Sequence, residues 1–195
     1  MAEKMGKDEP TDMKKVLILG DSISMGYRDY VKELLQGKAE VRFSEENGRY
    51  AKYTLHMVNQ WIRNISTPDI VHWNNGIWDI SVEPPLEGNF TPLPEYLYTL
   101  ERIIQTLQTA GAGKIIFATT TYQSPKFANT TQADIDLYNQ AACALMLRKG
   151  IEVNDLGAFV KPRVSEFVCD DLLHLNEAGY RACAAQVAAV IEKFL

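Results

Sequence analysis

The chain has 195 residues, of which 46% are hydrophobic and 23% are charged, which is typical of a globular domain with a substantial core. Its formal net charge of −5 disfavours nucleic acid and anionic membrane surfaces as partners. No apolar run is long enough to cross a bilayer, so we expect no membrane partner.

Predicted strands and helices alternate along the chain. Residues 1–13 are polar and charged and are predicted to form a flexible tail ahead of a single domain over 14–195. Short apolar runs predict strands at 16–19, 40–43, 69–73, 114–119 and 150–153. The spacing of apolar residues predicts helices around 27–35, 55–65, 97–107, 135–145 and 176–194. Residues 82–94 carry four of the eight prolines and predict a surface excursion, which either covers a site or contacts a second subunit.

This alternation predicts an α/β fold, a three-layer α/β/α sandwich with a five-stranded parallel sheet. Right-handed crossovers place the loops that follow the strands at one edge of such a sheet. The loops at Ser22, Gly48, 74–79, 120–125 and Asp155 are therefore expected to converge there. Open α/β sheets bind their ligands at this edge, so we expect the functional site in these loops.

The first strand leads through Gly20 and Asp21 to Ser22, at the start of the first predicted helix. The helix dipole favours negative charge at this place, and a serine hydroxyl there becomes a nucleophile if a base lies near it. A turn in which the serine or the aspartate only caps the helix fits the same residues. The presence of a base decides between these interpretations.

Three histidines are available as the base. His56 lies on a predicted amphipathic helix and His72 lies inside an apolar strand, so surface, packing or core roles suit them better. His174 follows Asp171 by three residues in a loop before the last helix. An imidazole that takes a proton from serine needs a carboxylate to fix its tautomer, and Asp171 can supply it. The alternative is that Asp171 and His174 only cap the last helix.

Nothing in the sequence indicates a metal ion or an organic cofactor. Cys143, Cys169 and Cys183 form neither an even disulfide framework nor a C-x-x-C motif. The H-E-x-x-H, P-loop and G-x-G-x-x-G patterns do not occur. We therefore expect a reduced, cytoplasmic protein without cofactor or metal, and its oligomeric state stays open.

Gly20-Asp21-Ser22 and Asp171-x-x-His174, at opposite ends of the chain, resemble the motifs of the SGNH (GDSL-type) hydrolase family. Asn47-Gly48 is similar to the second block of that family, and the resemblance extends from about residue 14 to residue 195. It implies a flavodoxin-like SGNH hydrolase fold with Ser22, Asp171 and His174 as the catalytic residues. It also implies that the backbone amides of Ser22 and Gly48 contribute to the oxyanion hole.

The third block of the resemblance departs from the usual Gly-x-Asn-Asp pattern. Gly76 and Asp79 match its ends, but Trp78 stands in the asparagine position, and Asn74 and Asn75 precede the glycine. A branch of the family with an Asn-x-Gly-x-x-Asp block is similar to this arrangement. Asn74 and Asn75 are both candidates for the third oxyanion donor, and on a continuing strand only one of them faces Ser22.

The resemblance also implies roles for the neighbours of these residues. Asp21, Trp78 and Tyr122 are the candidates for substrate contact, with Trp78 the foremost. Asp21 and Asp79 are also expected to tie the loops together through backbone hydrogen bonds. Ordinary packing fits each aromatic residue equally well.

These observations predict a serine esterase that hydrolyses short-chain acyl esters through an acyl-enzyme on Ser22, with carbohydrate O-acetyl groups as the expected substrate. A thioesterase or lysophospholipase would use the same residues and differ in pocket length. The alternative from another class is a non-catalytic flavodoxin-like binding domain, in which Ser22, Asp171 and His174 do not meet.

Overall fold

The computed structural model describes residues 13–65, 67–85 and 87–195, so the predicted tail lies outside the described residues except for Met13. Five parallel strands form one sheet in the order β2-β1-β3-β4-β5. They are β1 (Lys15–Leu19), β2 (Glu40–Phe43), β3 (Ile70–Asn74), β4 (Lys114–Ala118) and β5 (Glu152–Asn154). The predicted α/β class and the five-stranded parallel sheet are confirmed.

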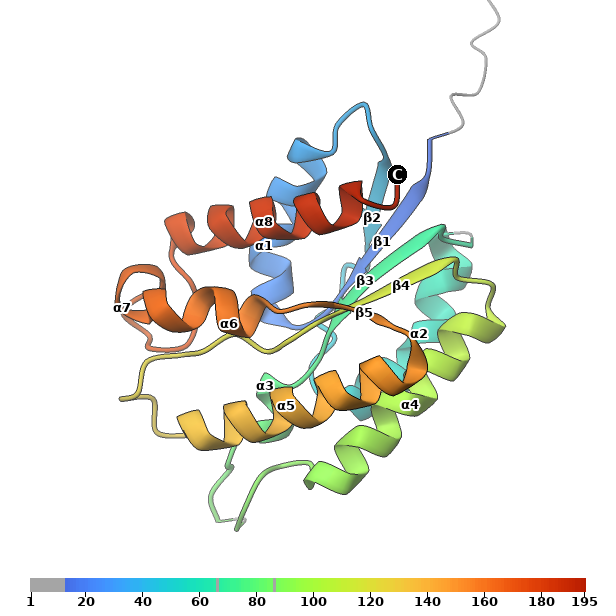
Figure 1. Cartoon of the computed structure of the whole chain (residues 1–195). Coiled ribbons are helices and arrows are strands. Elements are labelled where there is room, and N and C mark those ends of the chain that lie inside the picture. The colour runs from blue at the N-terminus through green and yellow to red at the C-terminus, as the bar shows by residue number, and fades with distance from the viewer. Residues whose placement is uncertain (1–12, 66, 86) are drawn as a thin grey trace, which may run out of the picture.

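Helices cover both faces of the sheet (Figure 1). The long ones are α1 (Ser22–Leu34), α2 (Ala51–Ile65), α4 (Leu93–Thr109), α5 (Gln132–Lys149) and α8 (Glu177–Glu192). Helices α1 and α8 pack together on one face, and α2, α4 and α5 lie on the other. Within the part of the chain that the structure describes, no helix has the length and apolar character needed to traverse a membrane.

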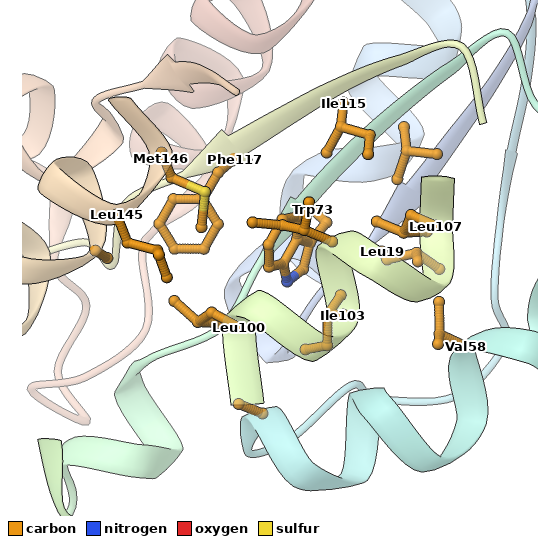
Figure 2. Packing of buried hydrophobic residues seen from close by; sticks show 14 of the residues in the cluster. Leu19, Val58, Trp73, Leu100, Ile103, Leu107, Ile115, Phe117, Leu145 and Met146 are labelled. Atoms are coloured by element: carbon orange, nitrogen blue, oxygen red, sulfur yellow. The ribbon is translucent and has the colours of Figure 1, made fainter. Parts of the chain in front are cut away.

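The central strand β3 is buried along its whole length. Alternate side chains of a strand point to opposite faces, so its residues belong to two cores. Trp73 packs against Phe117 of β4, with ring centroids 4.8 Å apart, in the core beneath α2 and α4 (Figure 2). Ile70 belongs to the other core, beneath α1 and α8. The almost continuous apolar run of this strand follows from burial on both faces.

Several short helices lie in segments for which the sequence analysis predicted no helix. They are α3 (Ile77–Ile80), α6 (Leu156–Val160), a 3-10 turn (Lys161–Arg163) and α7 (Val164–Phe167). Segments of three to five residues are too short to display a helical period, which is why periodicity did not reveal them. Helix α3 begins directly after β3 and carries Trp78 to the edge of the sheet.

The strand order changes direction between β1 and β3, because the chain adds β2 on one side of β1 and β3 on the other. Open α/β sheets bind ligands outside the carboxyl ends of their strands at such a point. The segments that follow β1 and β3 contain Ser22 and Asn75, respectively. The fold therefore directs attention to the loops around Ser22.

Candidate active site

Ser22 is the first residue of α1 and follows β1 after a two-residue turn. Asp21 caps the helix, since its carboxylate accepts a hydrogen bond of 3.0 Å from the Ile23 amide. A side chain at Gly20 would place its Cβ 1.8 Å from Asn74 Oδ1, so the turn requires glycine. The tight turn and the cap together hold Ser22 at the carboxyl edge of the sheet.

His174 reaches Ser22 from the opposite end of the chain. Its Nε2 lies 2.9 Å from Ser22 Oγ, and its Nδ1 lies 2.7 Å from Asp171 Oδ2. Ser22, His174 and Asp171, which the sequence analysis selected from opposite ends of the chain, therefore form one hydrogen-bonded row, which we call the edge row. An imidazole between a hydroxyl and a carboxylate is arranged to take a proton from the hydroxyl.

Asp171 is held by more than His174. Its Oδ1 accepts hydrogen bonds from the backbone amides of Leu173 at 2.9 Å and His174 at 2.8 Å, and from Cys169 Sγ at 3.1 Å. Desolvation alone would raise the pKa of Asp171, but these hydrogen bonds outweigh it and hold the pKa well below its usual value. Asp171 is therefore ionised wherever a neutral His174 could act as a base.

The loop that carries Asp171 and His174 is fixed by its own backbone. The Cys169 amide donates to His174 O at 2.8 Å, and the Asn176 amide donates to Phe167 O at 2.7 Å. Asn176 then caps α8, because its Oδ1 accepts from the Gly179 amide at 2.9 Å. The capping residue of α8 is therefore Asn176, and neither Asp171 nor His174 has this role. His174 and the cap come from one short segment.

An open cleft of about 360 Å³ lies over the edge row. Trp78 lines it from α3 with 41% of its surface exposed, whereas Trp61 and Trp73 are buried in the core. Most of the remaining wall is apolar, and the cleft is lined by Ser22, Ile77, Trp78, Ser81, Glu83, Phe127, Thr130, Leu173 and His174. The structure therefore places Trp78 where the sequence analysis expected a substrate contact.

The expected oxyanion donor Gly48 is otherwise engaged in the structure. Its amide donates to Gly20 O at 2.7 Å, which draws the loop after β2 against the turn before Ser22. A Cβ at Gly48 would also lie 2.7 Å from Gly20 O, so the two backbones pack too closely for any side chain. Gly48 has the packing role of a glycine here, and its amide is not free to bind an oxyanion.

The two asparagines lie on opposite sides of the sheet, and neither lines the cleft. Asn74 Nδ2 donates to Asp21 Oδ2 at 2.9 Å. Asn75 Nδ2 donates to Arg49 O and Thr54 Oγ1, both at 3.0 Å, so both its amide hydrogens are in use. Among the described residues, neither side chain bonds Ser22, and Asn74 Nδ2 keeps one hydrogen without a partner, so a donor role for one of them stays a prediction.

The Ser22 amide is different from these three donors. It belongs to the first turn of α1, where amides have no partner within the helix. Asp21 takes the next amide, that of Ile23, and among the described residues the Ser22 amide donates to no group. It is an expected oxyanion donor that remains available.

Two of the three expected substrate contacts lie away from the cleft. Asp21 is buried and accepts from Ile23 and Asn74. Tyr122 is also buried, and its hydroxyl bonds Asp136 and, at 3.2 Å, Lys161 Nζ. Both residues therefore have structural partners, and neither lines the cleft.

Asp79 joins the third block to α2, as expected for a loop tie. Its carboxylate accepts from the Ala51 amide at 3.2 and 3.0 Å. Burial raises the pKa of Asp79 to about 7 even though the hydrogen bonds from Thr91 and Ala51 lower it. This carboxyl group lies behind Trp78 and fixes α3 rather than lining the cleft.

The model of the GDSL-like Lipase/Acylhydrolase family matches residues 18–182, which span the edge row. The chain belongs to this family. It is accordingly a carboxylic ester hydrolase, and the suspected relationship to SGNH (GDSL-type) hydrolases is confirmed. A search of the curated proteins finds no match.

Solved structures of esterases share the fold of this GDSL-like hydrolase. A lipase/acylhydrolase from Enterococcus faecalis is 23% identical with a TM-score of 0.80, covering 93% of this chain and 96% of its own. The acetylxylan esterase Axe2 from Geobacillus stearothermophilus is 20% identical with a TM-score of 0.76, covering 91% and 94%. An acetyl xylan esterase, AlAXEase, is 21% identical with a TM-score of 0.76, covering 91% and 99%.

Sequence reasoning missed two features of this GDSL-like site. Cys169 contacts Asp171, and Glu83 lines the cleft from the proline-rich excursion. The two-residue spacing from Cys169 to Asp171 was visible in the sequence, but a thiol so placed carries no recognised motif. Nothing in the pattern around Glu83 distinguishes it from Glu87, because only the path of the loop decides which of them faces the cleft.

Proposed function

We propose that this GDSL-like hydrolase cleaves short-chain acyl esters through an acyl-enzyme on Ser22. The observation that carries the proposal is the edge row, with Ser22 Oγ 2.9 Å from His174 Nε2 at the floor of the cleft. The non-catalytic binding domain required these residues to stay apart, so their contact counts against it. The Asp171–His174 contact of 2.7 Å supports the same assignment.

In the first half of the reaction, His174 Nε2 takes the proton of Ser22 as Oγ attacks the ester carbonyl. The resulting tetrahedral intermediate collapses when His174 returns that proton to the leaving alcohol. This leaves an acyl group on Ser22. In the second half, water attacks the acyl group with His174 again as the base, and the acid leaves as Ser22 recovers its proton.

The negative charge of the intermediate is received by the Ser22 amide at the start of α1. That amide has no other partner among the described residues, and the helix dipole adds to its effect. One such donor contributes about 3 to 4 kcal/mol to the reduction of the barrier. Asp171 holds the imidazole in the tautomer with a hydrogen on Nδ1, so that Nε2 is free to accept.

The substrate class that we propose is carbohydrate O-acetyl esters. The exposed face of Trp78 beside Ser22 offers a flat apolar surface of the kind on which a sugar ring stacks. Two of the solved structures that share the fold are acetyl xylan esterases. An acetyl group needs little room, and the cleft leaves the larger part of its volume to the alcohol.

A second candidate is an acyl hydrolase for longer chains, of the thioesterase or lysophospholipase type. The observation in its favour is the apolar wall of Ile77, Phe127 and Leu173 around the same serine. The two candidates differ in which part of the ester occupies that wall. An acetylesterase places the alcohol there, and the second candidate places an acyl chain there.

The deciding experiment compares p-nitrophenyl acetate, butyrate and octanoate as substrates, together with acetylated xylo-oligosaccharides. An acetylesterase shows kcat/KM falling steeply from acetate to octanoate and releases acetate from the oligosaccharide. A rise toward octanoate without acetate release would favour the second candidate. Labelling of Ser22 by a fluorophosphonate tests the acyl-enzyme itself, and absence of labelling in a folded protein would contradict both.

A further inference from the structure

Glu83 lines the cleft, and its carboxylate has no hydrogen-bond partner within the part of the chain that the structure describes. Its side chain is exposed, and among the described residues it forms no ion pair with a lysine or arginine. The lining contains no aspartate, lysine or arginine. Its other ionisable residue is His174, which is bonded to Ser22 and Asp171. A single unpaired carboxylate therefore faces a wall that is otherwise mostly apolar.

The backbone fixes Glu83 at the cleft. The neighbouring Val82 forms two hydrogen bonds with Asn129, from its amide to Asn129 O at 2.7 Å and from Asn129 Nδ2 to its carbonyl at 3.1 Å. On the other side, the Phe90 amide donates to Ser81 O at 2.8 Å, which closes the base of the proline-rich excursion. This part of the excursion is therefore a wall of the cleft, tied to the loop that carries Phe127.

The same cleft presents aromatic side chains. Trp78 is the exposed tryptophan of the chain, and Phe127 lines the cleft as well. Aromatic faces attract cations through the ring quadrupole, with tryptophan the strongest, and an adjacent carboxylate adds a Coulombic attraction. A neutral alcohol gains only a hydrogen bond from one of its hydroxyl groups to the carboxylate, without the Coulombic attraction. A positively charged ester gains from both.

We propose that the cleft selects esters whose alcohol carries an ammonium group, bound between Glu83 and the Trp78 and Phe127 rings. The inference rests on the proposed function, because it places the charged alcohol beside the serine that would be acylated. The net charge of −5 attracts such substrates over a longer range. Two kinds of alcohol share this chemistry, a quaternary amino alcohol such as choline and an amino sugar.

The test measures binding of four small alcohols that form two matched pairs. Choline is compared with 3,3-dimethylbutan-1-ol, which has the same shape without the charge, and D-glucosamine is compared with D-glucose. Binding is followed by the intrinsic fluorescence of the three tryptophans, of which Trp78 lines the cleft, and, independently, by inhibition of p-nitrophenyl acetate hydrolysis. The fluorescence titration does not depend on turnover, so failure of the proposed function and failure of this inference are distinguishable.

We expect the charged member of at least one pair to bind about five- to thirtyfold more tightly than its neutral partner. Preference within the choline pair identifies a quaternary alcohol, and preference within the glucosamine pair identifies an amino sugar. Glu83→Gln is expected to reduce the preference about two- to fivefold. Glu87→Gln, which changes an exposed glutamate of the same excursion outside the cleft lining, is expected to leave it unchanged.

Salt offers a second route that needs no variant. An exposed carboxylate is screened at high ionic strength, so raising NaCl from about 0.05 to 0.5 M should lower the preference of the wild type. Equal binding within both pairs would overturn the inference. So would a preference that neither Glu83→Gln nor high salt diminishes.

Discussion

His174 and His72 show how the position of a histidine relative to the sheet determines its chemistry. His174 lies beyond the carboxyl ends of the strands, with a partner on each ring nitrogen and the cleft above it. His72 lies in the middle of β3 and is completely buried. Its Nε2 lies 3.2 Å from Asn154 Nδ2, and among the described residues its Nδ1 has no partner.

Burial has a direct consequence for the charge of His72. Desolvation disfavours the imidazolium and lowers the pKa of His72 to about 3, so this ring stays neutral at physiological pH. It contacts neither solvent nor the cleft and has no route by which to exchange a proton with a substrate. The comparison teaches that a histidine is positioned to exchange a proton with a substrate where it lies outside the sheet and beside the cleft.

The largest effect is expected for Ser22→Ala. Removal of the nucleophile leaves His174 without a group to deprotonate, and kcat should fall by about four orders of magnitude or more. Kinetics with p-nitrophenyl acetate measure the loss, and fluorophosphonate labelling should disappear with it. Ser24→Ala is the matched control, since Ser24 lies two residues along α1 and is buried away from the cleft. Undiminished turnover in Ser22→Ala would contradict the role of the edge row.

Asp171→Asn should reduce kcat by about 10³- to 10⁴-fold while the fold persists. The introduced side-chain amide would donate to His174 Nδ1 and so favour the tautomer with a hydrogen on Nε2, which cannot accept the proton of Ser22. The carbonyl oxygen of the same side chain could still accept from the Leu173 and His174 amides, so the loop should keep its conformation. The measurement is kcat together with the melting temperature. A large drop in melting temperature would indicate a structural role instead.

The edge row was predictable because each of its members has a local signature. Ser22 follows a strand and a tight turn, and Asp171 and His174 share one segment, so their types and spacing carry the information. The parallel sheet also follows from the alternation of strands and helices. In contrast, the use of a backbone or side-chain amide depends on which acceptor lies nearest in three dimensions. The sequence therefore could not reveal that the Gly48 amide donates to Gly20 O. Nor could it reveal that Asn75 donates to Thr54 in α2 and to Arg49 in the loop before that helix.

Tyr122 and Glu83 show the same limit at the substrate wall. Tyr122 lies in a loop at the functional edge, but its hydroxyl is drawn to Asp136 and Lys161. Glu83 lies in an excursion whose sequence offers no periodicity, and its place at the cleft depends on hydrogen bonds between Val82 and Asn129. Loop residues converge on an edge predictably, whereas the direction of each side chain is set by long-range contacts.

His72→Leu should affect stability and leave kcat within about twofold of the wild type. Loss of the ring leaves Asn154 Nδ2 without its acceptor and should cost about 1 to 3 kcal/mol at pH 7. The pKa of His72 is lower in the folded state than the ordinary 6.5, so the unfolded chain binds more protons between pH 6.5 and about 3. Wild-type stability therefore contains a contribution that is lost as the pH falls through this window, by up to about 1.4 kcal/mol per pH unit.

Urea unfolding at pH 7 and pH 4.5 measures this effect as a difference between proteins. The disadvantage of His72→Leu should shrink at the lower pH, because the variant lacks the group that is protonated on unfolding. His56→Gln is the control, since it replaces a histidine that is exposed on α2. An equal pH dependence in His72→Leu and the wild type would contradict the neutral, buried state of this ring.

Asp79→Asn should produce a pH dependence of the opposite sign. Burial raises the pKa of Asp79 from 3.8 to about 7, so the folded chain binds more protons than the unfolded chain between these values. The contribution of this group to wild-type stability is therefore lost as the pH rises from about 4 to 7. The asparagine can still accept from the Ala51 amide and does not ionise. Its stability relative to the wild type should increase with pH up to about 7 and then level off, as urea unfolding across that range would measure.

The smallest effect is expected at Cys169, the thiol that donates to Asp171 Oδ1 at 3.1 Å. Burial and the neighbouring carboxylate raise the pKa of Cys169, so the thiol stays protonated and can donate. Cys169→Ala removes one of three donors to that oxygen, while the Leu173 and His174 amides remain. We expect kcat to fall about two- to fivefold, because the remaining bonds hold most of the geometry.

Cys169→Ser distinguishes positioning of Asp171 from simple packing. Its hydroxyl keeps a donor at the same place with a smaller volume, so it should restore kcat to near the wild-type value if the hydrogen bond matters. If the volume of the sulfur matters instead, the serine variant should be impaired to a similar extent as alanine. The effect should also appear in kcat rather than KM, because Cys169 does not line the cleft and its thiol donates to Asp171, the residue that orients His174. A change confined to KM would show that the thiol shapes the cleft, which would separate it from the edge row.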